Sequence, residues 1–309
     1  MTFSGQKVLV TGASGFIGFH LCQSLIRLDA QVYGISRKSK TNFESNIHWC
    51  KGDLADLISV RRLLTTIKPD IIFHLASYVS GSRDLKVVLP VFNSNLLSTI
   101  NILAVSTEIG FRRIILAGSL EEPETGDFEA IPASPYAAAK MASSAYARMF
   151  HALYQTPVVI ARLFMVYGPR QQDLRKLIPY VTLSLLSKQA PKLSSGRRQV
   201  DWIYIDDVVS GLLSMAHAPN VEGHTIELGS GTLVTIRNVV KQLVNITESN
   251  VKPLFGSIPD RPMEQVRIAN TAKTYDEIGW KPMTTLEKGL EYTVNWYRKH
   301  LTRVEGIVS

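Results

Sequence analysis

A glycine-rich string directly follows the first apolar run of the chain. Residues 7–10 read Lys-Val-Leu-Val, and residues 11–18 read Thr-Gly-Ala-Ser-Gly-Phe-Ile-Gly. In a strand-to-helix turn, Gly12 permits the tight turn, Gly15 lets the backbone approach a diphosphate, and Gly18 allows close contact between helix and sheet. The diphosphate then lies at the positive end of the helix. The string predicts a dinucleotide-binding unit, with further cofactor contacts from Ser14, Phe16 and Ile17.

Apolar runs alternate with helical patterns through most of the chain. We expect strands at seven ranges, 7–11, 31–35, 47–51, 70–75, 113–118, 158–163 and 225–228. Continuous apolar strands separated by helices indicate βαβ units and a buried parallel sheet. The predicted fold class is therefore α/β, a Rossmann doubly wound parallel sheet of about seven strands.

The pattern changes after Gly168-Pro169. An amphipathic helix and a polar loop are expected within 169–199, a strand at 200–205 and a helix at 206–218, and the last amphipathic helix is expected at 286–301. We therefore predict two domains with interrupted boundaries. Residues 1–168 plus 200–229 would form the dinucleotide-binding domain, and residues 169–199 plus 230–309 would form a smaller α/β substrate domain.

The charge balance narrows the range of partners. The 309 residues carry a formal net charge of +8, but no run of five basic residues occurs. This scattered pattern argues against nucleic-acid binding and suits a substrate that carries a diphosphate. No purely apolar stretch approaches the ~20 residues of a membrane span, and no apolar leader precedes the first strand. Cys22 and Cys50 lack metal-ligand spacing, so we expect a cytoplasmic protein with no metal and no membrane partner.

The end of the second expected strand indicates which dinucleotide is bound. Proteins that bind NAD place an acidic side chain there, which accepts hydrogen bonds from the ribose hydroxyls. This chain has Ser36-Arg37-Lys38 and no acid until Glu44. A serine and two cations would hold a 2′-phosphate that a carboxylate would repel. We therefore expect NADP(H), with NAD the less favoured cofactor and loop surface the alternative role for the two cations.

Tyr136 and Lys140 are spaced i, i+4 and so share one face of a helix. A free tyrosine is a poor base at neutral pH, and a nearby ammonium is expected to lower its pKa. Ser119 follows an expected strand, at the sheet edge where ligands bind. We expect these three residues to be catalytic, with Tyr136 exchanging a proton and Ser119 bonding the reacting oxygen while a hydride moves.

The chain resembles an extended short-chain dehydrogenase/reductase of the nucleotide-sugar epimerase/dehydratase family over nearly its whole length. The matching segments, beyond the glycine string and the Tyr136/Lys140 pair, are Gly52-Asp53-Leu54, His74-Leu75-Ala76-Ser77, Asn95, 162–169, 201–207, 228–231, Arg261-Pro262 and 286–290. The resemblance implies a seven-stranded Rossmann sheet and a C-terminal domain that binds a nucleoside-diphosphate sugar. It also implies a homodimer formed by the helix near Asn95 and the Tyr136 helix.

The resemblance extends the set of expected contacts. Further cofactor contacts would come from Asp53, Leu54, Leu75, Ala76, Ser77, Asn95 and Leu163 together with Tyr136 and Lys140; Asp53 could equally cap a helix. Substrate contacts would come from Ser80, Met165, Arg170, Lys176, Arg198 and Arg261. The alternatives are a surface position for Arg261 and burial within one subunit for the two dimer helices.

Several positions depart from the family pattern. The usual Tyr-Gly is missing after Ser119, and Met165 stands where an asparagine that touches the diphosphate is common. Val200 replaces a common arginine, for which Arg197 or Arg198 could substitute, and Glu227 replaces an asparagine. These departures concern the sugar pocket more than the hydride chemistry.

Three reactions remain open at the sequence level. Glu121 has the spacing of a 4,6-dehydratase base, whereas Leu120 stands where some dehydratases have an acid; a glutamate at the rim of an acidic loop is the alternative for Glu121. A net reductase draws on NADPH, so Ser36-Arg37-Lys38 favours reduction of a 4-keto-6-deoxyhexose. A 4,6-dehydratase and a 4-epimerase are the other enzymatic hypotheses. A non-catalytic NADP-sensing protein is the hypothesis of another class, and the retention of Tyr136 and Lys140 argues against it.

Overall fold

The computed structural model describes residues 2–37, 46–123 and 130–300, which form two compact units. Unit 1 comprises Met1–Leu163, Val209–Leu228 and Ala272–Trp280. Unit 2 comprises Phe164–Val208, Gly229–Thr271 and Lys281–Ser309. The division differs from the sequence-based boundaries at four places, two of them small, since residues 164–168 and residue 229 belong to unit 2. Residues 200–208 belong to unit 2, because their strand pairs within that unit, and residues 272–280 belong to unit 1.

Unit 1 is built on a parallel seven-stranded sheet in the order β10-β6-β5-β4-β1-β2-β3. Its strands are β1 (Lys7–Thr11), β2 (Gln31–Ser36), β3 (His48–Lys51), β4 (Ile71–His74), β5 (Arg113–Ser119), β6 (Val158–Leu163) and β10 (Thr225–Leu228). All seven expected strands are present, with ends shifted by at most one residue. The strand order reverses between β1 and β4, and ligands of such sheets bind at the carboxyl ends beside that reversal.

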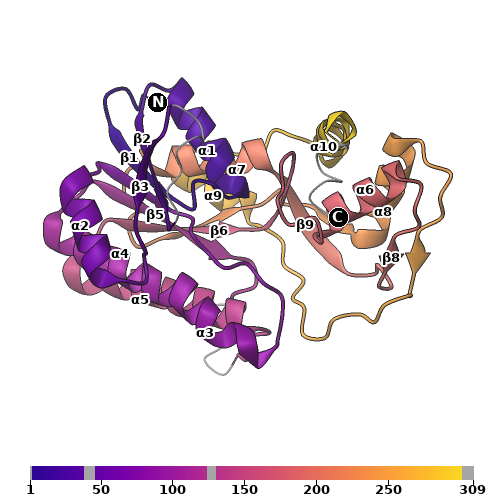
Figure 1. Cartoon of the computed structure of the whole chain (residues 1–309), viewed down its shortest axis with the longest axis horizontal. Coiled ribbons are helices and arrows are strands. Elements are labelled where there is room, and N and C mark those ends of the chain that lie inside the picture. Colours follow the sequence, from indigo (N-terminus) through magenta and orange to yellow (C-terminus); the bar gives the residue numbers. More distant parts are fainter. Residues whose placement is uncertain (1, 38–45, 124–129, 301–309) are drawn as a thin grey trace. The chain divides into compact units, whose positions relative to one another are not determined.

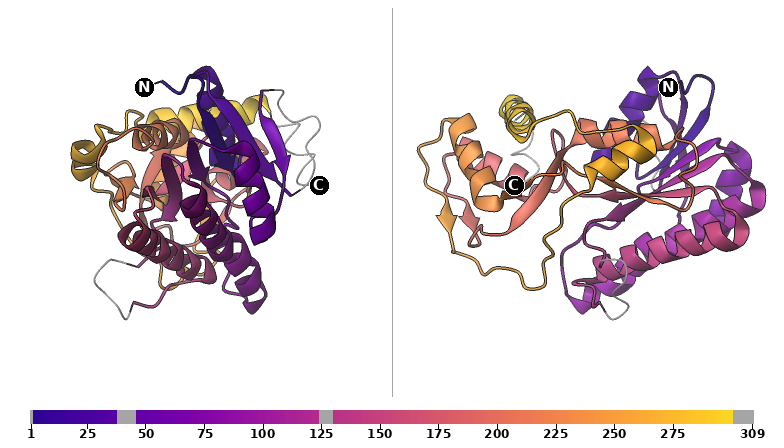
Figure 2. Two further views of the ribbon diagram at one scale, coloured as in Figure 1. Left: turned by 90° about the vertical axis from the view of Figure 1, so that its left-hand side faces the viewer. Right: turned by 180° about the vertical axis from the view of Figure 1, so that it is seen from behind.

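Helices cover both faces of this sheet (Figures 1 and 2). The helices α2 (Leu57–Ile67), α4 (Ser98–Ile109) and α5 (Pro135–Tyr154) lie on one face, and α1 (Phe16–Arg27) lies on the other. Side chains alternate along each strand, so every second residue of β5 points to the same face. The cluster under α2, α4 and α5 accordingly contains Ile114 and Leu116 but not Ile115. Its other buried members include Leu9, Leu64, Ile72, Ile102, Phe150 and Ile160.

A long helical stretch precedes β5. It consists of η1 (Leu85–Val87), α3 (Val88–Val91), a π-helical turn η2 (Phe92–Leu97) and α4. By length and composition alone, Leu85–Ile109 passes the test for a membrane-spanning helix. In unit 1 its α4 part packs against α2 and α5 and contributes Ile102, Leu103 and Val105 to the buried cluster. The α4 part of the stretch is thus a core helix of this unit.

Unit 2 contains two small sheets. The first has the order β11-β9-β7, from β11 (Leu233–Thr235), β9 (Gln199–Tyr204) and β7 (Met165–Tyr167), and the second pairs β8 (Lys192–Leu193) with β12 (Leu254–Phe255). Three helices accompany them, α6 (Leu177–Leu186), α8 (Ile236–Thr247) and α10 (Leu286–Lys299). Two further helices cross the unit limits, α7 (Ile205–Met215) and α9 (Thr271–Ile278). The expected helix within 169–199 is shorter than its apolar pattern, because it begins only at Leu177.

Buried contacts fix the loops of unit 2. Asp201, 1% exposed, accepts hydrogen bonds from the backbone N–H groups of Ser230 (2.6 Å), Gly231 (3.0 Å) and Ala269 (3.0 Å). On α10, a Cβ at Gly289 would overlap the Tyr167 hydroxyl, so glycine permits this close approach. The Tyr167 hydroxyl donates to the Leu286 carbonyl at 3.2 Å.

Candidate active site

The glycine string forms a tight cradle at the carboxyl end of β1. Gly12 has φ +69°, and a Cβ there would lie 2.9 Å from the backbone nitrogen of Ala76. A Cβ at Gly18 would overlap the Gly12 carbonyl oxygen, so this helix position also requires glycine. Helix α1 starts after Gly15 with no side-chain cap and no acid in its first turn. Its first N–H groups are therefore suited to an anionic ligand.

A chain of buried hydrogen bonds supports the cradle from below. The Ala76 N–H donates to Thr11 Oγ1 (3.1 Å), which contacts His74 Nδ1 at 2.8 Å. His74 Nε2 contacts Thr99 Oγ1 at 3.1 Å, and the Thr99 hydroxyl donates to the Asn95 carbonyl at 2.6 Å. Since Thr99 donates to Asn95, it accepts from His74, and the proton of the neutral ring is assigned to Nε2. Burial, with the charge of Lys140, lowers the pKa of His74 to about 3.

A buried polar atom beside the cradle is also consistent with a bound dinucleotide. Among the described residues, the Ser77 hydroxyl is buried and has no hydrogen-bond partner. Leu75, Ala76 and Ser77 follow β4, and Leu75 and Ala76 lie beside Gly12. A buried hydroxyl normally has a partner, so a ligand at this edge would complete it. Ser14, Phe16 and Ile17 are half-buried in the string itself.

The cofactor-selecting residues lie at the end of β2. Ser36 is half-buried as the last residue of β2, and Arg37 follows with its side chain exposed. Lys38 lies outside the described residues. Asp53 caps a local turn, since its Oδ1 accepts from the Ala55 N–H at 3.0 Å, and the Leu54 carbonyl accepts from the Asn101 side chain at 3.0 Å. The helix-capping alternative for Asp53 is wrong, because the N-cap of α2 is Asp56.

Ser119, Tyr136 and Lys140 come together where β5 ends and α5 begins. Ser119 closes β5, and α5 starts at Pro135 with Ser134 as its cap, so Tyr136 lies in the first turn of the helix. The phenol of Tyr136 and the Ser119 side chain share a hydrogen bond. Lys140 donates from Nζ to the Ala117 carbonyl at 2.7 Å and lies 5.9 Å from the centre of the Tyr136 ring. The predicted trio is thus assembled within unit 1.

The net pKa of Tyr136 is raised, against the expectation that a nearby ammonium would lower it. Burial raises the pKa of Tyr136, the nearby Glu121 and Glu122 charges raise it further, and only the Ser119 hydrogen bond acts in the opposite direction. Burial also lowers the pKa of Lys140 to about 8, against the influence of Glu122. A phenol with a raised pKa keeps its proton at neutral pH, so Tyr136 is a neutral phenol and not a phenolate base in the substrate-free protein.

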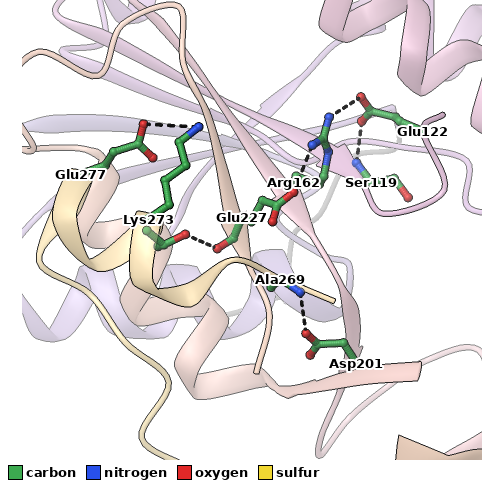
Figure 3. Close-up of polar contacts among 9 residues, drawn as sticks. Ser119, Glu122, Arg162, Asp201, Glu227, Ala269, Lys273 and Glu277 are labelled. Atoms are coloured by element: carbon green, nitrogen blue, oxygen red, sulfur yellow. Dashed lines mark hydrogen bonds and ion pairs between the residues drawn. The ribbon is translucent and has the colours of Figure 1, made fainter. Parts of the chain in front are cut away.

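The turn after Ser119 holds two glutamates in different settings. The half-buried Glu121 donates its N–H to Ser119 Oγ at 3.2 Å. Glu122 is 3% exposed and accepts from the Ser119 N–H at 2.7 Å (Figure 3). Leu120 is buried, and its N–H donates to the Leu163 carbonyl at 3.0 Å, which continues the pairing of β5 with β6. Sequence reasoning missed Glu122, whose only signal was its membership of an acidic loop.

Asn95 and Ser80 have local partners in unit 1. Asn95 lies in the π-helical turn and is 2% exposed; its side chain accepts from the Tyr78 N–H (2.7 Å) and donates to the Tyr78 carbonyl (3.2 Å). It therefore fixes the loop after β4. The Ser80 hydroxyl accepts from the Ser82 N–H at 3.2 Å.

The other expected substrate contacts belong to unit 2. Met165 is half-buried on β7, and Lys176 is the half-buried N-cap residue of α6. Arg170 (φ +65°) and Arg261 are exposed. Arg198 is engaged within the unit, pairing with Glu264 at 3.1 Å and donating to the Gln265 carbonyl at 3.0 Å.

The family model described as NAD dependent epimerase/dehydratase family matches residues 8–229. The chain belongs to this family. The dTDP-glucose 4,6-dehydratase of Haemophilus influenzae is 28% identical over 332 residues, covering 94% of this chain and 98% of that protein. The UDP-glucose 4-epimerase of Thermotoga maritima, solved with UDP-glucose, gives a TM-score of 0.87 at 26% identity, covering 96% of this chain and 99% of that one.

The UDP-glucuronic acid 4-epimerase of Bacillus cereus, solved with UDP-glucuronic acid and NAD, gives a TM-score of 0.85 at 25% identity, covering 95% of this chain and 99% of that one. The resemblance to extended short-chain dehydrogenases/reductases is therefore confirmed, and so is the Rossmann fold. The chain is an NAD(P)-dependent enzyme of that superfamily, in the branch that acts on nucleotide sugars.

Proposed function

We propose that this enzyme uses NADPH to reduce the 4-keto group of a nucleoside-diphosphate 4-keto-6-deoxyhexose. The observation that carries the proposal is the Ser119–Tyr136 pair with Lys140 behind it, next to a buried Leu120. This set provides a proton donor and an oxygen-binding hydroxyl, which is what a carbonyl reduction requires.

Each residue then has one task in the reaction. A nicotinamide cofactor held at the glycine cradle would supply a hydride for the carbonyl carbon. Ser119 holds the carbonyl oxygen, and Tyr136 gives that oxygen its proton, so a C=O bond becomes a C–OH group and the cofactor is oxidised. The ammonium of Lys140, held by the Ala117 carbonyl, stabilises the phenolate until solvent returns the proton.

A 4,6-dehydratase is less well supported by this site, although several relatives carry that name. Water elimination needs a base and an acid in addition to the hydride apparatus. Glu121 could serve as the base, but Leu120 has no proton to give and Glu122 is occupied by the Ser119 N–H. A 4-epimerase is the second candidate, because it needs the same three residues and the Thermotoga maritima structure is an epimerase.

The choice of cofactor separates the reductase from the epimerase. A reductase exchanges its cofactor at every turnover, and the exposed Arg37 beside Ser36 offers a cation and a hydroxyl for a 2′-phosphate. The Bacillus cereus structure contains NAD, which an epimerase keeps in place. We propose NADP(H) for this chain on the chemistry of Ser36 and Arg37, which also suits a cytoplasmic reductase.

We further propose that unit 2 binds the substrate diphosphate and that the enzyme is a homodimer. Arg170, Lys176 and Arg261 supply cations for the diphosphate. For the dimer, exposed apolar side chains lie on η1, α3 and η2 (Leu85, Leu89 and Phe92) and at the end of α5 (Leu153 and Tyr154), and η2 and α3 pack against α5. Light scattering should give the mass of two chains, and L89D/F92D should give the mass of one; a monomeric wild type would contradict the dimer.

The deciding experiment offers purified enzyme a panel of nucleoside-diphosphate 4-keto-6-deoxyhexoses with NADPH. We expect NADPH to be consumed in proportion to sugar, with a deoxysugar as product. A cofactor that stays bound and unconsumed while a nucleoside-diphosphate hexose is epimerised would overturn the reductase in favour of the epimerase. Release of a 4-keto-6-deoxy product would instead identify a dehydratase.

A further inference from the structure

Glu122 is a buried carboxylate fastened to the backbone of the catalytic serine. Its Oε1 accepts the Ser119 N–H at 2.7 Å, and its own N–H donates to the Ser119 carbonyl at 3.2 Å. A Cβ at Gly118 would lie 2.8 Å from the same Oε1, so glycine at this position makes room for the carboxylate. Glu122 therefore fixes the backbone of Ser119 from two sides.

Arg162 supplies the positive charge that a buried carboxylate needs. Arg162 lies on β6 with its side chain 8% exposed, between Glu122 at 4.0 Å and Glu227 at 3.1 Å (Figure 3). Glu227 comes from β10, and the Thr274 hydroxyl donates to its carbonyl at 2.9 Å. Arg162 thus contacts two positions that depart from the family pattern, namely the turn after Ser119 and Glu227.

The charge of Glu122 also acts on the two proton-bearing groups of the site. It raises the pKa of Lys140, opposing the lowering caused by burial, and it raises the pKa of Tyr136. The other groups that act on them are His74 of β4, which is neutral beside Lys140, and Glu121, which faces Tyr136. Glu122 is the charge that acts on both.

We propose that Glu122 is a positioning residue for proton transfer, which holds Ser119 beside Tyr136 through the Ser119 N–H and places a buried negative charge, paired with Arg162, next to the trio. The carboxylate does not touch the substrate in this account. It acts through Ser119 and Lys140, and Arg162 keeps its charge in place.

The sign of its effect on pH dependence follows directly. Without the negative charge of Glu122, burial lowers the pKa of Lys140 below about 8, and the pKa of Tyr136 also falls. Reduction requires both protons, so the alkaline limb of the kcat profile should move toward neutral pH. Removing one close charge of this kind should shift the alkaline limb of the kcat profile by about one pH unit.

The test compares E122Q with E227Q, because each removes one carboxylate from Arg162 and only the first touches Ser119. The kinetic readout rests on the proposed function. The second readout does not: the titration of Lys140 in the substrate-free protein, followed by NMR with isotope-labelled lysine and assigned with K140R. Thermal unfolding of both variants controls for the loss of an Arg162 partner.

We expect E122Q to lower both the Lys140 titration midpoint and the alkaline limb by about one unit, and E227Q to move them much less. Equal shifts in the two variants, or no shift in E122Q, would overturn the proposal. If E122Q does not fold, E122D decides: it keeps the charge but shortens the reach to Ser119, so kcat should fall while the Lys140 midpoint stays. A Lys140 shift in a protein that reduces no sugar would contradict the proposed function alone.

Discussion

The carboxyl end of the sheet has two neighbouring parts, a first edge at β1 and β4 and a second edge at β5 and β6, which are built in different ways. At the ends of β1 and β4, the close contacts are made by backbone, with Gly12 against Ala76 and a neutral His74 bonded to two threonines. At the ends of β5 and β6, buried charges from Lys140, Glu122 and Arg162 surround Ser119. The first edge offers shape and N–H groups for a ligand, and the second offers protons and charge. The two should therefore respond differently to substitution and to pH.

Tyr136→Phe should produce the largest effect of any single substitution. Phenylalanine keeps the ring in α5 but has no proton to give, so turnover should fall by about 10²–10⁴-fold. Cofactor affinity, measured by fluorescence titration, should stay close to that of the wild type, because the β1/β4 edge is unchanged. Tyr146→Phe, on the exposed side of the same helix, is the matched control. Equal activity of the two variants would remove Tyr136 from the mechanism.

Gly18→Ala should damage the first edge without touching the second. Its Cβ would overlap the Gly12 carbonyl oxygen, and such overpacking costs about 1–3 kcal/mol of unfolding free energy. Urea unfolding measures this loss, and cofactor affinity should fall with it because the cradle must shift. Gly15→Ala is the graded comparison, since its Cβ would lie 3.1 Å from the same oxygen. Gly15→Ala should therefore lose less unfolding free energy than Gly18→Ala. Equal losses in the two variants would contradict a cradle built by close packing.

His74 should make the first edge sensitive to acid. Its pKa is about 3 in the folded protein and 6.5 in the unfolded chain, so the unfolded state binds more protons between these values. Its stabilising contribution is complete above pH 6.5 and is lost as pH falls, by at most about 1.4 kcal/mol per pH unit. Urea unfolding at neutral and acidic pH should show a weaker pH dependence in His74→Asn, and no such change in the exposed His48→Asn.

Arg37→Glu should have the smallest effect of the four and bears on cofactor choice. Replacing a phosphate-binding cation by a carboxylate should raise the KM for NADPH by about tenfold and leave that for NADH nearly unchanged. Arg62→Glu, an exposed arginine of α2, removes the same charge elsewhere and should change neither value. A KM for NADPH that is insensitive to Arg37 would favour NAD.

The sequence predicted what depends on local pattern. The seven strands follow from apolar runs, and the Tyr136/Lys140 pair follows from helical spacing, so both were found. The contacts among Glu122, Arg162 and Glu227 join three segments far apart in the chain, so no local sequence pattern predicts them. The raised pKa of Tyr136 was missed for a related reason, because burial depends on packing. The pairing of the strand at 199–204 with β7 and β11 was not predicted either, since an apolar pattern does not reveal the partners of a strand.

Transfer of deuterium from labelled NADPH to a nucleoside-diphosphate 4-keto-6-deoxyhexose tests the central claim most directly. Hydride delivery to the carbonyl carbon while Tyr136 protonates the oxygen predicts one deuterium at C4 of the product for each NADP⁺ formed. It also predicts that Tyr136→Phe slows both the deuterium transfer and the formation of NADP⁺ by about 10²–10⁴-fold while still binding the cofactor. A product without deuterium, or label that returns to the cofactor as the sugar is epimerised, would contradict net reduction by this enzyme.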